Sequence, residues 1–125
     1  MNGDSIHNQA QRKRDETKTI SMKMQSDEQA CQIDINKYQQ EMQRREAELN
    51  NPDKDQGVVQ SDMHSYQSQI EKKQAELNSI RSSYQDKINQ LEKEAVNLDQ
   101  KAAEEDKKQT QKRAAIIAAN LSNNK

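Results

Sequence analysis

The chain has 125 residues, of which 30% are hydrophobic, 2% are aromatic and 33% are charged, and its 5 Leu, 9 Ile and 3 Val are too few for an ordinary globular core. Twenty basic and 21 acidic residues give a net charge of −1, so charge repulsion does not hold the chain open, and without a basic excess we expect no nucleic-acid ligand. Two Gly, one Pro and one Cys exclude a β-sandwich, a Gly-rich nucleotide-binding fold and a disulfide scaffold. The fold class that remains compatible with this composition is one of long exposed helices.

The first expected element is a helix over residues 5–49. Read back from residue 49, a stripe of residues spaced three and four apart runs through this segment: Leu49, Arg45, Met42, Tyr38, Ile35, Cys31, Glu28, Met24, Ile20, Thr17, Lys13, Ala10 and Ile6. This spacing places side chains along one face of an α-helix. The stripe therefore predicts a long helix with one buried face that polar residues interrupt.

A turn is expected over residues 50–57, whose sequence NNPDKDQG holds the only Pro and the second of the two Gly. Its Asp53-x-Asp55-x-Gly57 pattern differs from a calcium loop, because Gly stands at position five and His64 occupies position twelve, where the loop needs Glu. We interpret the segment as a polar turn in which an Asp starts the next helix.

The second expected helix covers residues 58–120. Its stripe has the same three-and-four spacing, with Lys73 at one position and one four-residue stutter after Tyr84, and its apolar members are Val59, Met63, Tyr66, Ile70, Leu77, Ile80, Tyr84, Ile88, Leu91, Ala95, Leu98 and Ala102. A stripe that repeats in this way is typical of a coiled coil.

The two stripes fit one antiparallel register in which the numbers of facing residues sum to 108. The same register brings charged residues of opposite sign together in four pairs: Lys73 with Asp34, Lys13 with Glu94, Arg81 with Glu28, and Arg45 with Asp62. We therefore predict an all-α fold in which residues 1–125 form a single elongated domain. This domain is a long antiparallel two-helix coiled-coil hairpin, either alone or dimerised into a four-helix bundle.

Residues 103–125 are expected to project beyond the first helix as an overhang. This overhang ends in an apolar helical patch for which the hairpin offers no partner. We predict that it binds a partner protein or another copy of the chain through Ala114, Ile116, Ile117, Ala118 and Leu121. The alternative interpretation is a poorly ordered, Ala-rich tail.

Side chains that could carry chemistry do not converge in this register. His7 falls near Lys101, His64 near Arg44, and Cys31 opposite Leu77. We therefore predict no catalytic site, metal site, cofactor or small-molecule substrate, and hence no enzyme. No stretch is long and apolar enough for a membrane span or a secretory signal, so we expect a cytoplasmic protein, although export without a leader would leave the same pattern.

The expected function is that of a non-enzymatic protein–protein interaction hairpin, acting as a stalk, adaptor or chaperone-like component of a larger assembly. In its two long polar helices, short turn and projecting ends, the chain resembles the stalk hairpins of flagellar and type III secretion systems, which implies a place in a secretion-type machine. Its neutral charge differs from that of a strongly basic stalk. Two alternatives are a self-assembling scaffold or filament subunit and a flexible segment that becomes helical only on binding.

Overall fold

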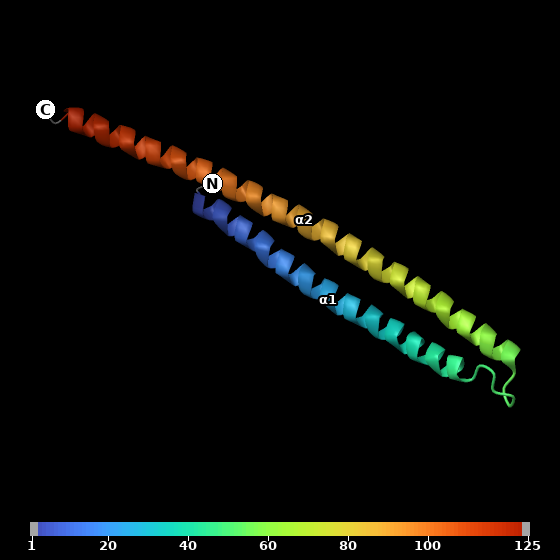
Figure 1. The fold of residues 1–125 in the computed structure, drawn as a ribbon. Helices are drawn as coiled ribbons and strands as arrows, with labels where there is room; N and C mark the ends of the chain where they lie inside the picture. The colour runs from blue at the N-terminus through green and yellow to red at the C-terminus, as the bar shows by residue number, and fades with distance from the viewer. Residues whose placement is uncertain (1–2, 124–125) are drawn as a thin grey trace. The chain divides into compact units, whose positions relative to one another are not determined.

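The computed structural model describes residues 3–123, which form two helices, α1 (Gly3–Ala47) and α2 (Gln56–Asn123), joined by residues 48–55 (Figure 1). Within this range there is no strand. The prediction of an all-α helical hairpin is confirmed, and each predicted helix boundary lies within three residues of the observed one. Pairing of hairpins into a four-helix bundle stays a prediction.

The contacts within the chain group into two units. The turn unit consists of residues 21–86, and the described part of the terminal unit consists of residues 3–20 and 87–123. Each unit contains one segment of α1 and one of α2.

The core of the turn unit consists of residues from the two predicted stripes, which meet in a seam between α1 and α2. Its buried cluster comprises Cys31, Ile35, Ile70 and Leu77, against which Tyr38, Met42 and Ile80 pack, and Val59 is buried as well. Burying an Ile or Leu side chain contributes about 1.5–3 kcal/mol. Near the turn, the rings of Tyr38 and Tyr66 lie 6.4 Å apart between centroids. The predicted stripe therefore faces the partner helix.

The turn is closed by side-chain hydrogen bonds. Asp55 Oδ1 accepts hydrogen bonds from the backbone N–H groups of Gly57 (3.0 Å) and Val58 (3.3 Å), as an N-cap residue does. The Gln56 side chain accepts from Asn50 N–H and donates to the carbonyls of Glu48 and Asn51. The cap explains why α2 begins at Gln56.

In the terminal unit, small and branched side chains share the seam. The buried residues are Ile6, Ala10, Ile20, Ile88, Leu91, Ala95 and Ala102. Ala10 and Ala102 are completely buried, and their small size allows the two helical segments to pack closely.

All four predicted ion pairs are present. In the turn unit, Arg45 lies 3.0 Å from Asp62, Lys73 lies 3.4 Å from Asp34, and Arg81 lies 3.5 Å from Glu28. In the terminal unit, Lys13 lies 3.1 Å from Glu94. These partly exposed pairs contribute little to stability, because water and salt screen them. They confirm the predicted register within each unit.

Within residues 3–123, neither helix contains a stretch long and apolar enough to cross a membrane.

Candidate interaction surface

The contacts between α1 and α2 in the terminal unit reach as far as Asp106. Gly3 lies against the Asp106 side chain, and His7 Nε2 lies 3.5 Å from Asp106 Oδ2. Because α1 begins at Gly3, two residues before the predicted start, these contacts extend four residues beyond Ala102. We define the overhang as residues 107–123; residues 124 and 125 of the expected overhang lie outside the described chain.

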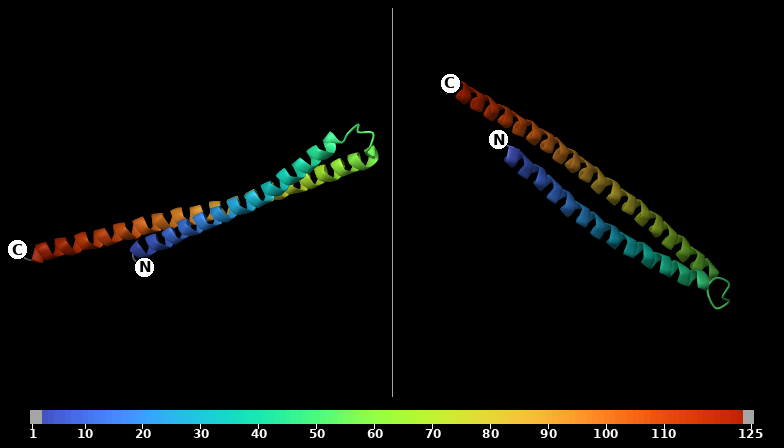
Figure 2. Two further views of the ribbon diagram at one scale, coloured as in Figure 1. Left: turned by 90° about the horizontal axis from the view of Figure 1, so that it is seen from below. Right: turned by 60° about the vertical axis from the view of Figure 1, so that its left-hand side comes forward.

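The overhang is helical and exposed along its whole length. In both views of Figure 2, this red end of α2 continues past the blue start of α1. Gln109, Thr110 and Arg113 still line a cavity together with Gly3 and Asp4 at the start of α1. Its large apolar side chains are as open as those of a free helix, with exposed fractions of 60% for Ile116, 58% for Ile117 and 65% for Leu121.

Four of the five predicted contact residues share one helical face. Ala114, Ile117, Ala118 and Leu121 stand in the i, i+3, i+4, i+7 relation, which aligns side chains on one side of an α-helix. We call these four residues the overhang face. Ile116 points about 100° away around the helix from Ile117, so it lies outside this face.

The overhang is also strongly basic. Residues 107–123 contain Lys107, Lys108, Lys112 and Arg113 and no acidic residue, which gives a charge of +4. Lys108 lies 3.7 Å from Glu105, whereas the other three have no ion-pair partner within residues 3–123. Lys107, one heptad before Ala114, and Arg113, four residues before Ile117, lie beside the overhang face. The surface is therefore an apolar stripe with cationic flanks.

A second surface, in the turn unit, was missed by the sequence analysis. A cavity of about 370 Å³ is lined by Met42, Leu49, Gln60, Met63, His64 and Gln67. A neighbouring cavity of about 470 Å³ shares Met42 and Gln67 and extends to Ile70 and Gln74. We call the two together the turn groove. Met42 and Met63 belong to the two predicted stripes, and the structure leaves both partly buried, with Met42 packed against the core cluster.

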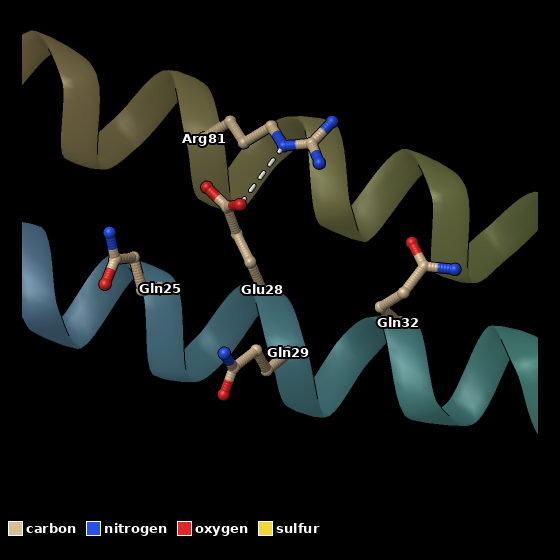
Figure 3. A pocket seen from close by; sticks show the side chains of 5 residues that line it. All are labelled: Gln25, Glu28, Gln29, Gln32 and Arg81. Carbon is tan, nitrogen blue, oxygen red and sulfur yellow. Dashed lines mark ion pairs between the residues drawn. The ribbon is translucent and has the colours of Figure 1, made fainter.

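Another cavity of the turn unit lacks the features of a ligand site. It has a volume of about 240 Å³ and is lined by Gln25, Glu28, Gln29, Gln32 and Arg81. Figure 3 shows Glu28 and Arg81 pointing toward each other while the three Gln side chains point in different directions. The volume is below the roughly 300 Å³ of ordinary ligand pockets, and its charged groups satisfy each other.

The side chains that could carry chemistry have separate surroundings. His7 Nδ1 lies 3.3 Å from Asp99, His64 lines the turn groove, and Cys31 Sγ donates a hydrogen bond to the Lys73 carbonyl at 3.2 Å. The register placed His7 near Lys101 and did not identify Asp99 or Asp106 as its neighbours. Within residues 3–123, no group of three potential metal ligands forms.

Two pKa shifts have simple causes. Hydrogen bonding to Arg14, and to a lesser degree to His7, holds the pKa of Asp99 below its ordinary value. The Tyr84 hydroxyl donates a hydrogen bond to Asp27 at 2.6 Å, which raises the pKa of Tyr84 because the neutral hydroxyl is needed for this bond. Each shift arises from contacts between α1 and α2 within a single unit, which is the terminal unit for Asp99 and the turn unit for Tyr84.

No protein family, curated protein sequence or solved structure was found to match the chain. The overhang and the turn groove are therefore the features of the described chain that indicate a function.

Proposed function

We propose that this protein is a non-enzymatic protein–protein interaction hairpin that docks on its partner through the overhang face. The observation that carries the proposal is the exposure of Ile117 and Leu121, at 58% and 65%, on a helix that leaves the paired part of the terminal unit. An apolar stripe on one face of a helix is the form in which helices enter grooves of partner proteins. Docking would remove this stripe from water.

The cationic flanks support the same role. Charged residues around an apolar contact increase the rate of encounter and select a partner of opposite charge. With Lys107 and Arg113 beside the overhang face, the preferred partner surface is acidic around an apolar centre.

The wider setting belongs to the same proposal. The hairpin acts as a stalk, adaptor or chaperone-like part of a larger assembly, which the layout shared with secretion stalks supports. Cys31 is the single cysteine of the sequence and cannot form a disulfide within the chain, which is compatible with a reducing compartment, and a cytoplasmic location is part of the same proposal.

Photo-crosslinking from the overhang tests this function. A photoreactive amino acid replaces Ile117 in the full chain, expressed in the cells that normally make it. The matched control places the same group at Lys112, about half a turn around the helix. We expect discrete crosslinked products of higher mass from position 117 and only weak ones from position 112.

The same experiment can refute the function. Equal crosslinking from both positions would show that the overhang face has no role, and no product from either would show that the overhang does not dock.

A further inference from the structure

We propose that the partner of the overhang is a second copy of this chain, whose turn groove receives the overhang face. This inference rests on the proposed function and names the occupant of the overhang face. It requires two surfaces of one chain to match in size, polarity and charge.

The dimensions match. Along α2 the turn groove extends from Gln60 to Gln74, which corresponds to about 21 Å of helix, and the 17 residues of the overhang cover about 25 Å. The groove is therefore long enough to lie along the overhang face.

The apolar parts match as well. Met42, Leu49 and Met63 line one end of the groove and Ile70 the other. Met is flexible and adapts to the shape of what it contacts. On the other surface, Ala114 and Ala118 allow close approach, so that Ile117 and Leu121 can reach the Met side chains.

The charges are complementary. The two helical segments that form the groove, residues 39–49 and 60–74, carry Glu41, Glu46, Glu48, Asp62 and Glu71 against Arg44, Arg45, Lys72 and Lys73, a net charge of −1, whereas the overhang carries +4. Arg44 is paired with Glu41, and Arg45 is paired with Glu48 and Asp62. Glu46, which lines the groove, has no ion-pair partner within residues 3–123.

The contact is heterologous, because the overhang face and the turn groove are different surfaces. Each copy therefore offers one of each. A dimer made in this way keeps an unused overhang and an unused groove, so assembly continues into a ring or an open chain of copies.

Light scattering over a concentration series tests the inference on the full chain. We expect the average mass to rise from the single-chain value of 14.5 kDa to at least about twice that value between roughly 1 and 100 μM at low salt. High salt should weaken the rise, because it screens the charges.

Two pairs of variants locate the contact. On the overhang, Ile117→Gln should abolish the rise, whereas Ile116→Gln, an equally exposed neighbour outside the face, should leave it unchanged. In the groove, Gln43→Lys with Gln67→Lys should repel the basic overhang, whereas the same two charges at Gln40 and Ser65, which do not line the groove, should not. Circular dichroism checks that each variant remains helical.

Mixing the two defective proteins gives the decisive result. Ile117→Gln retains its groove, and the Gln43→Lys/Gln67→Lys protein retains its overhang, so together they should form a complex of two chains that grows no further. A mixture that stays at the single-chain mass would overturn the inference.

The outcomes separate this inference from the proposed function. If Ile117→Gln abolishes association but the groove variant does not, the overhang docks elsewhere, so this inference fails and the proposed function stands. If the chain never associates while position 117 crosslinks to a different protein, this inference also fails and the proposed function also stands. If position 117 crosslinks to nothing, both fail.

Discussion

Within the terminal unit, residues 87–106 and residues 107–123 belong to the same helix. Apolar side chains are buried in the first segment and exposed in the second. Ile88 and Ala95 on the paired segment are 6% and 2% exposed, whereas Ile116 and Ile117 on the overhang are 60% and 58% exposed. Composition does not explain this difference. Seven of the eight residues from Ala114 to Leu121 are apolar, against four of the eight from Ala95 to Ala102.

The comparison shows that burial here is decided by what lies alongside the helix. The paired segment has α1 against its seam, and the overhang has no segment of residues 3–123 against its face. A single helix of 17 residues is marginal in water, because its own hydrogen bonds barely offset the cost of ordering it. The overhang therefore has the most to gain from a partner.

The largest expected effect compares the same substitution in the two segments. Ile88→Ala should lower the free energy of unfolding by about 2–3 kcal/mol, near the lower limit for buried Ile because a two-helix seam relaxes easily. Ile117→Ala should change it by less than about 0.5 kcal/mol, because the side chain is exposed and Ala favours the helix. Urea titrations at low protein concentration, followed by circular dichroism, measure both. Equal losses would contradict the difference between the segments.

Hydrogen exchange sharpens the comparison residue by residue. At low concentration the amides of residues 107–123 should exchange at least about 100-fold faster than those of residues 87–102, because only the latter are protected by tertiary contacts. Raising the concentration should slow exchange in the overhang if it docks on another copy. Mass spectrometry of proteolytic fragments reads both segments in one sample, and uniform protection along α2 would be the opposing result.

The smallest expected effect concerns an ion pair of the paired segment. Because Arg14 and His7 lower the pKa of Asp99, the folded state binds fewer protons there than the unfolded state. This contribution to stability is therefore present above pH ~4, the ordinary Asp range, and is lost as the pH falls through the lowered pKa of the folded state. Asp99→Asn should lower the unfolding midpoint at pH 7, by less than Ile88→Ala does, and the difference from the wild type should vanish in acid.

Asp86→Asn is the matched control for this titration, because Asp86 makes no ion pair within residues 3–123. It should leave the midpoint unchanged at either pH. A pH-independent loss in Asp99→Asn would mean that the carboxylate acts through packing instead of charge.

The fold could be predicted because two weak signals agreed. The apolar spacing of the two stripes and the four pairs of opposite charge gave the same register. The spacing does not reveal the hydrogen bond from Tyr84 to Asp27, because this bond depends on how far the Tyr side chain reaches across to the other helix.

The candidate site was only half predictable. Ile117 and Leu121 stand out in the sequence because apolar residues without a facing stripe need a partner. The turn groove did not stand out, because Met42 and Met63 follow the seam pattern.

The turn has a consequence for the order of folding. Contacts between the helices join residues ever further apart in the chain, from 42 positions for Cys31 and Lys73, through 57 for Tyr84 and Asp27, to 92 for His7 and Asp99. In an open chain, closing the longest of these loops costs about 0.7 kcal/mol more in chain entropy than closing the shortest. Once the contacts beside the capped turn exist, each next contact closes only a few more residues. The hairpin therefore forms its contacts in order from the turn outward. The first residues of α1 can make their contacts with α2 only after most of α2 has been synthesised.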